Sequence, residues 1–294
     1  MAFSPLTWSL LILLIAINIV LVMRMNGLLG FLQHGRDEDV LIGQDKLVNF
    51  GIAHGTMRMM WSTPILKLNL LQSVAQSPNA AILGFKYQEV LALILKSVRN
   101  GYQHVAQLYA ENITKDDPAG PNGLNSLFFR WQTKTQDGWR SMFETTEALV
   151  ALKTVEQFWQ TGVDIFLAGI GQSEEFIASR SRTLHPWATV HSDCFWHDVH
   201  THPQNLVSGV FYVSVPPGSG KIVFYDPRGK FPPFDDTYDV YPEPGDLIIF
   251  PSWLPHLVSA SRTTVDNPRV SIAFNIEGSW YDTSAVSTEF PVIQ

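Results

Sequence analysis

The feature that most constrains the fold is a series of short strand-like segments in the second half of the chain. From about Leu184 to Glu277, β-branched and aromatic runs are repeatedly interrupted by Pro, Gly and Asp. Examples are LVSGVFYVSV, GDLIIFPS and RVSIAFNI. Regularly spaced short strands of this kind indicate a β-sandwich or a jelly roll. We therefore predict a double-stranded β-helix, that is a jelly roll, with its core at about residues 184–280.

Helical patterns precede the predicted jelly roll. Residues 84–110 and 140–170 carry apolar side chains at three- and four-residue spacing, which is typical of amphipathic helices. Ser141 followed by Glu144 is a candidate capping box for the second helix. Alternating apolar and polar positions predict a first strand at 61–71. The expected fold class is α+β, with N-terminal helices packed on the outside of the jelly roll and a transmembrane helix before them.

That transmembrane helix is predicted from an uncharged apolar run between Leu6 and Met23. As a helix the run spans about 27 Å, enough to cross the hydrocarbon core of a bilayer. No basic region precedes it and no small-x-small cleavage site follows, so we predict a single-pass membrane anchor at residues 1–24. A cleaved signal peptide and a buried helix are the alternatives.

The expected location is therefore a membrane. Basic and acidic residues are mixed after the apolar run, so the orientation of the anchor stays open. Asn112-Ile113-Thr114 fits the N-glycosylation pattern and is compatible with the secretory pathway. Residues 25–55 are polar and contain Gly, which predicts a stalk or linker. Residues 56–284 are expected to form one domain, since no boundary linker divides them, and 285–294 form a tail.

Composition excludes some classes of function. The net charge is −7 and no long basic run is present, so broad electrostatic attraction to nucleic acid is not expected. Cys194 is the single cysteine, which rules out an intrachain disulfide and a cysteine-based zinc site.

Histidines form the strongest local signal for chemistry. Five of the nine histidines lie within 185–202. His200 and His202 are two residues apart and would point to the same face of a strand. His256 lies in a distant segment of the sequence. Imidazole is the commonest side-chain ligand of transition metals, so these three are candidate metal ligands. A rival set lies in the same cluster: His191 and Asp193, with a distal histidine, would supply two imidazoles and one carboxylate.

Several segments of the second half carry recognisable motifs: PWATV, HTHPQNLVSGVFYVSVPPGSGKIVFYDPR, PEPGDLIIFPSWLPHLVSAS and RVSIAFN, with STPIL and DGWRSMF upstream. These segments resemble the family of 2-oxoglutarate/Fe(II)-dependent oxygenases, which is distantly similar to prolyl 4-hydroxylases. The resemblance covers about residues 60–280 and is specific from Trp187 to Asn275.

The resemblance implies an iron site near one mouth of the barrel. It favours His200 and His202 over the rival pair, which the family places in the preceding loop. His202 then stands where related oxygenases carry a carboxylate. Asp226, which closes the strand KIVFYD, is our candidate for the missing carboxylate, and a centre of three histidines is the alternative.

The resemblance also implies Fe(II) as cofactor, with 2-oxoglutarate and O2 as co-substrates. Arg269 is the expected anchor for the distal carboxylate of 2-oxoglutarate, because a guanidinium can bind a carboxylate through two parallel N–H bonds. Ser271 and Tyr212 are expected to add contacts to the same group. The implied reaction is a dioxygenase reaction that hydroxylates a substrate and releases succinate and CO2.

Two other functions remain open. A cupin-like dioxygenase would use three histidines without 2-oxoglutarate, although the Arg269-x-Ser271 pair argues against it. A jelly-roll binding module would have no enzymatic activity. The substrate is not readable from the sequence: a protein, a peptide, a lipid and a small molecule are all compatible with it.

Overall fold

The computed structural model describes residues 45–50, 53–60, 63–75, 80–112, 130, 133–192, 194–232 and 234–278. The predicted anchor at 1–24 and the predicted tail at 285–294 lie outside these residues and stay predictions. Among the helices within them, none combines the length and the apolar character needed to span a membrane.

The larger of two antiparallel sheets has seven strands in the order β1-β2-β3-β9-β6-β11-β4. Its middle strands come from distant parts of the chain, because β9 pairs with β3 on one side and β6 on the other. The strands are β1 (Asp45–Phe50), β2 (Ala53–Met60), β3 (Thr63–Asn69), β4 (Leu184–His191), β6 (Asn205–Ser214), β9 (Asp246–Pro251) and β11 (Arg269–Glu277).

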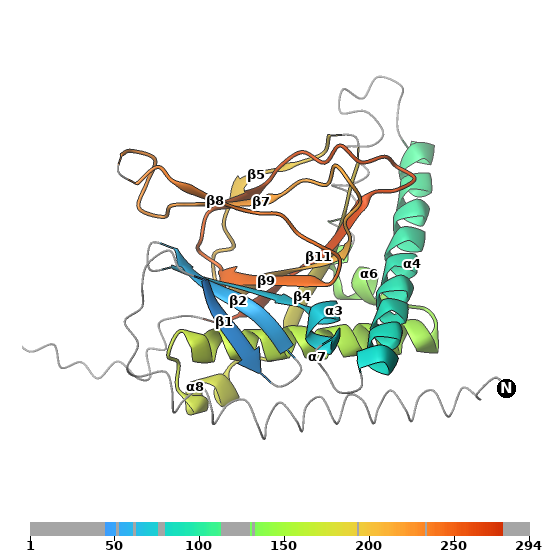
Figure 1. The fold of residues 1–294 in the computed structure, drawn as a ribbon. Helices are drawn as coiled ribbons and strands as arrows, with labels where there is room; N and C mark the ends of the chain where they lie inside the picture. Colours follow the sequence, from blue (N-terminus) through green and yellow to red (C-terminus); the bar gives the residue numbers. More distant parts are fainter. Residues whose placement is uncertain are drawn as a thin grey trace, which may run out of the picture.

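A smaller sheet of four strands faces the larger one, as Figure 1 shows. Its order is β5-β10-β7-β8, and each pairing is antiparallel. Two facing antiparallel sheets with strands that alternate between them are a jelly-roll-like arrangement, as the strand pattern predicts. The strands are β5 (His197–His200), β7 (Ile222–Tyr225), β8 (Thr237–Val240) and β10 (His256–Val258).

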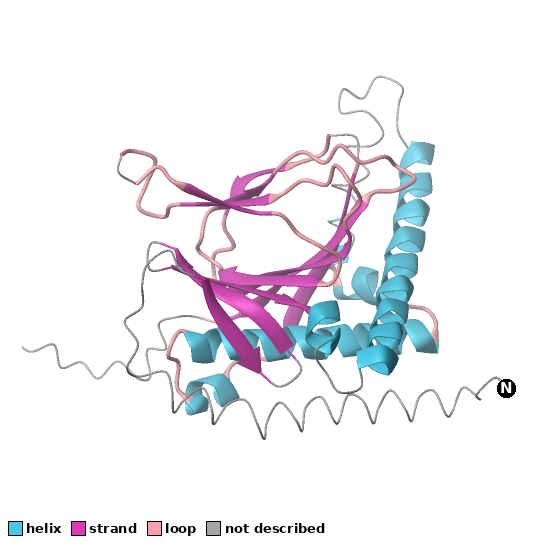
Figure 2. Cartoon of the chain, viewed as in Figure 1, coloured by secondary structure: helices cyan, strands magenta, loops and turns pink. Residues whose placement is uncertain are grey.

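Helices cover the outer face of the larger sheet (Figure 2). The predicted helix at 84–110 is confirmed as α4 (Ala80–Asn112), and α7 (Thr146–Gly169) lies within the predicted range 140–170. The cap prediction is wrong, because the hydroxyl of Thr145 accepts a hydrogen bond from the Ala148 N–H and begins α7. Shorter helices are α3 (Leu70–Ala75), α6 (Gln136–Ser141) and α8 (Glu174–Ser179).

Residues 25–55 were expected to be a stalk, and the structure differs there. Their described part contains β1 and the start of β2, and β2 pairs along its length with β3. The strand predicted at 61–71 is accordingly β3, the third strand rather than the first. The polar composition that suggested a linker is compatible with a sheet edge, where one side of each strand meets solvent.

Alternating side chains of the larger sheet divide the interior into two cores. On β6, Phe211 points outward to the helices, while Val210 and Tyr212 point between the sheets. The helix-facing core includes Trp159 of α7, whose ring stacks on Phe274 of β11 at a centroid distance of 5.0 Å. The helix-facing side of the sheet is therefore a dry apolar interface, and the opposite side is free to carry polar groups.

Candidate metal centre

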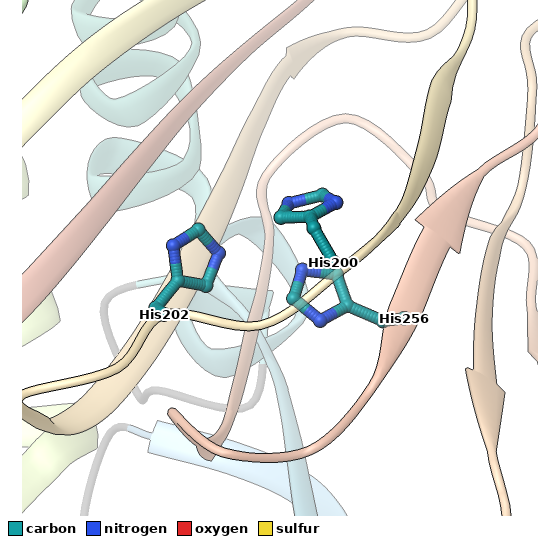
Figure 3. Close-up of side chains that lie close together, drawn as sticks. All are labelled: His200, His202 and His256. Atoms are coloured by element: carbon teal, nitrogen blue, oxygen red, sulfur yellow. The ribbon is translucent and has the colours of Figure 1, made fainter.

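Three histidines come together between β5 and β10. His200 is the last residue of β5 and lies opposite His256, the first residue of β10, in the antiparallel register. His202 follows two residues later, and its N–H donates to the Ser252 carbonyl at 2.8 Å. Each imidazole offers one nitrogen within 4.8 Å of the nitrogens of the other two. Figure 3 shows the three rings gathered around a common space.

Hydrogen bonds orient two of these rings. The Nδ1 atom of His200 lies 2.7 Å from the Asp198 carbonyl, and that of His256 lies 2.9 Å from the Leu254 carbonyl. A carbonyl only accepts, so each Nδ1 carries the proton. This leaves Nε2 of both rings with a free lone pair, which is the arrangement found behind metal-bound histidines.

The electrostatic surroundings keep the three imidazoles neutral. Burial, together with the neighbouring His256 and His200, lowers the pKa of His202 to about 2. Burial and His200 lower the pKa of His256 to about 4, although its hydrogen bond to the Leu254 carbonyl opposes the shift. Burial also lowers the pKa of His200. Neutral imidazoles are the form that binds a metal, so this donor set fits a divalent transition metal such as Fe(II).

Asp226, the predicted carboxylate ligand, does not join the three histidines. Its buried carboxylate instead accepts hydrogen bonds from the Arg228 side chain, at 2.9 Å from Nε and 2.7 Å from Nη2, and from the Arg228 N–H at 2.9 Å. These bonds to Arg228 lower the pKa of the Asp226 carboxyl. The carboxylate therefore organises the turn after β7, and the described residues bring three histidines together without a carboxylate.

His191, from the rival pair, lies apart from this set and contacts Arg269. Its ring is fully buried, and Arg269 Nη1 donates to His191 Nδ1 at 2.7 Å. Since Nδ1 accepts, Nε2 carries the proton, and no partner for it exists among the described residues. Asp193 lies outside the described residues. The structure thus assigns His191 a contact with the predicted 2-oxoglutarate anchor, a contact that its position in the sequence did not suggest.

The predicted anchor residues lie on the inner face of the larger sheet. Arg269 begins β11, is 1% exposed, and its guanidinium lies 5.0 Å from the centre of the Tyr212 ring. Ser271 is two residues on, and its hydroxyl lies 2.8 Å from that of Thr189. Burial raises the pKa of Tyr212, so its hydroxyl keeps its proton. The structure brings all three predicted residues together.

An open pocket joins this group to the three histidines. Its volume is about 480 Å³, counting the space that is open to solvent. Among the described residues that line it there is no Asp or Glu, but there are two arginines and five histidines. Four buried polar atoms of its lining residues have no hydrogen-bond partner among the described residues: Arg130 Nε, Arg269 Nε, His191 Nε2 and the Tyr212 hydroxyl. Buried donors without partners are rare and costly, so the pocket is suited to an oxygen-rich anion.

Sequence comparison agrees with this geometry. Residues 185–275 match the Putative 2OG-Fe(II) oxygenase family. The match covers β4 to β11 and confirms the resemblance read from the motifs between Trp187 and Asn275. This family implies Fe(II) as cofactor and 2-oxoglutarate and O2 as co-substrates. No curated protein sequence matches this chain.

Part of the chain is similar to solved structures of prolyl hydroxylases and of a dioxygenase. A prolyl-4-hydroxylase from Pseudomonas putida is 15% identical with a TM-score of 0.34, over 44% of this chain and 66% of that one. A prolyl hydroxylase from Trichoplax adhaerens, in complex with a hypoxia inducible factor peptide fragment, is 11% identical with a TM-score of 0.35, over 46% and 59%. Salicylate 1,2-dioxygenase from Pseudoaminobacter salicylatoxidans is 16% identical with a TM-score of 0.23, over 32% and 20%. The match spans less than two thirds of the length of each of these chains.

Proposed function

We propose that this protein is a 2-oxoglutarate-dependent Fe(II) dioxygenase that hydroxylates a C–H bond of its substrate. The observation that carries the proposal is a shared pocket. Three neutral imidazoles suited to iron and four buried donors without partners among the described residues line the same space. His200, His202 and His256 would hold the iron, and Arg269, Ser271 and Tyr212 would hold the distal carboxylate of 2-oxoglutarate.

The absence of a carboxylate from the described lining fits this assignment. Three imidazoles leave the full charge of a divalent ion in place, and Arg269 adds another positive charge. 2-Oxoglutarate carries two negative charges, so its binding offsets two of these three positive charges. His191 would assist by accepting a hydrogen bond from Arg269, which orients the guanidinium, and by offering its Nε2 proton to an anion.

Iron in this pocket would supply the oxidation, in which O2 converts 2-oxoglutarate to succinate and CO2 and places one oxygen atom in a substrate C–H bond. The protein's own contribution is positioning and the exclusion of water. Phe224 and Phe250 pack near His256, at ring-centroid distances of 6.0 and 4.7 Å, and shield one side of the site. The other side is open through the pocket, where a substrate can approach.

The test is succinate release by the purified chain with Fe(II), 2-oxoglutarate and ascorbate, together with direct measurement of iron and 2-oxoglutarate binding. We expect stoichiometric iron, 2-oxoglutarate binding that requires the metal, and slow succinate release even before a substrate is known. A His202→Ala variant should lose iron and succinate release together. If the wild-type chain binds neither iron nor 2-oxoglutarate, the proposal fails.

A second candidate is a cupin-like dioxygenase that uses three histidines without 2-oxoglutarate. The three-histidine set favours it, because such a centre has no carboxylate ligand. A 2-oxoglutarate titration separates the two: metal-dependent binding that the Arg269→Ala variant weakens supports the first proposal. Retained metal without 2-oxoglutarate binding supports the second, and the absence of metal from protein purified with iron supports a binding module.

Attachment to a membrane through residues 1–24 is a separate proposal that rests on the apolar run alone. Fractionation of the full chain and of a chain that begins at residue 25 would test it. We expect the full chain in the membrane fraction and the shortened chain outside it.

A further inference from the structure

We propose that the substrate of this enzyme carries a negatively charged group and that Arg130 binds it at the rim of the metal pocket. The inference deepens the proposed function and rests on it. It concerns a residue outside the matched segment 185–275, in the chain between α4 and α6.

Arg130 is a cation that lines the pocket and has no anionic partner among the described residues. Its Nη1 atom contacts the Nε2 atom of the neutral His197 at 3.4 Å, a long contact that can satisfy little of a guanidinium. Its Nε atom is buried and has no hydrogen-bond partner among the described residues. Within that part of the chain, no carboxylate forms an ion pair with it. A partly buried charge without a counter-ion costs stability and therefore indicates a ligand.

The position of Arg130 is built into the fold. The Thr133 hydroxyl accepts a hydrogen bond from the Ala188 N–H of β4 at 3.1 Å and lies 3.2 Å from the Arg130 carbonyl. Thr133 itself is only 2% exposed. These contacts attach the segment to the edge of the larger sheet, so Arg130 is presented to the pocket by a fixed anchor.

Arg130 and Arg269 are suited to two different anions. Arg269 is 1% exposed on the inner face of β11, whereas Arg130 is half-buried and lines the same pocket. The rings of His191 and His197 stand between them, with their centroids 4.7 Å apart. Arg269 contacts His191 and Arg130 contacts His197. We therefore assign the inner arginine to 2-oxoglutarate and the outer one to the substrate.

A second cation strengthens the assignment. Lys134, four residues beyond Arg130, lies with its ammonium group 4.8 Å from the centre of the Trp187 ring. The Trp187 ring in turn lies 5.6 Å from the His202 ring. Two cations thus lie close to the histidines, Arg130 beside His197 and Lys134 beside Trp187. An anionic substrate would be attracted to this region, and a cationic one would be repelled.

The test uses a pair of probes of the same shape, hexanoate and hexanamide. The full chain is loaded with Mn(II) and saturated with 2-oxoglutarate, which occupies Arg269. Paramagnetic relaxation of the probe protons then reports binding close to the metal. We expect hexanoate to bind at least about tenfold more tightly than hexanamide, because a charged hydrogen-bond acceptor strengthens the contact to a guanidinium.

Arg130→Gln should abolish this preference while leaving the affinities for Mn(II) and 2-oxoglutarate unchanged. Arg130→Lys should keep part of it, and Arg140→Gln, an exposed arginine in α6, should keep all of it. Equal binding of the two probes by the wild type would overturn the inference. So would a loss of 2-oxoglutarate affinity in Arg130→Gln, which would place Arg130 in the 2-oxoglutarate site. If the wild type binds neither metal nor 2-oxoglutarate, the proposed function fails, and the inference falls with it.

Discussion

The two faces of β11 bury side chains of opposite character. Val270, Ile272 and Phe274 are completely buried and pack against the helices. Arg269 and Ser271 alternate with them, are equally buried, and line the pocket. One face is satisfied by apolar contacts, whereas the other contains a buried charge and a donor without a partner. A single strand thus combines stability on one side with a binding site on the other, and the period of two along a strand keeps the functions separate.

The largest effect should follow removal of a metal ligand on the pocket side. His256→Ala should lose bound iron and lower succinate release at least about a hundredfold, since even residues behind a metal ligand typically contribute ten- to hundredfold. Metal analysis and succinate release check this outcome. His185→Ala, which removes an exposed histidine that pairs with Glu277, is the matched control and should retain both. Activity of His256→Ala at the wild-type level would exclude the three-histidine centre.

The helix-facing side should respond in stability rather than in binding. Phe274→Ala removes a ring that stacks on Trp159 and lies against Gly209, where an added Cβ would come within 2.3 Å of it. We expect a loss of about 3–5 kcal/mol in the free energy of unfolding, measured with urea. Ser271→Ala on the opposite face should cost only about 1 kcal/mol. Comparable losses at both positions would contradict the separation of the two faces.

Arg269→Gln, on the pocket face, should reduce ligand binding rather than stability. We expect a ten- to hundredfold loss of 2-oxoglutarate affinity, because each charge-assisted hydrogen bond contributes about 1.5–3 kcal/mol. Iron content should not change, and the free energy of unfolding should stay the same or rise, since the substitution removes a buried charge. Calorimetric titration with 2-oxoglutarate, alongside metal analysis and urea unfolding, measures all three. Parallel loss of iron would point to a folding defect instead.

The smallest expected effect is a dependence of stability on pH in the metal-free protein. Burial lowers the pKa of His197 to about 3, with Arg130 adding to the shift, and burial with His200 lowers that of His256 to about 4. The unfolded chain, with ordinary histidine pKa values near 6.5, binds these protons first. Stability is therefore complete above about pH 6.5 and falls as the pH decreases toward 4. Urea unfolding at pH 7.5 and pH 5 should show the decrease, and His256→Ala should reduce it.

Much of the strand-rich half could be predicted because its signals are local. The β-branched and aromatic runs Leu206–Val213 and Leu247–Phe250 are properties of neighbouring residues, and Pro, Gly and Asp mark the turns between strands. The spacing of His200 and His202 is local as well, and the structure brings both to His256. The prediction of Arg269, Ser271 and Tyr212 as neighbours relied on the family resemblance, and the structure also brings these together.

The features that were not predicted depend on which side chains or strands contact one another in the folded chain, and local sequence patterns do not encode these contacts. The Asp226 carboxylate accepts hydrogen bonds from the side chain of Arg228, two residues away, and therefore does not join the histidines. The polar residues before Ala53 were expected to be a linker but form an edge strand, because edge strands tolerate polar side chains. Arg130 is held at the pocket because Thr133 is hydrogen-bonded to Ala188, 55 residues away in the sequence. The periodicity of the sequence does not predict a contact over this distance.

The pairing of His200 with His256 has a consequence for the order of assembly during folding. β5 is an edge strand, and within the described sheets it pairs with β10 alone. Two candidate ligands lie on β5 and just after it, and the third lies on β10, so the centre cannot exist before these distant segments meet. Such long-range closure is slow and occurs late. Bound iron would then stabilise the pairing of β5 with β10, which forms last. Amide hydrogen exchange in β5 should therefore slow more than elsewhere when the metal is added.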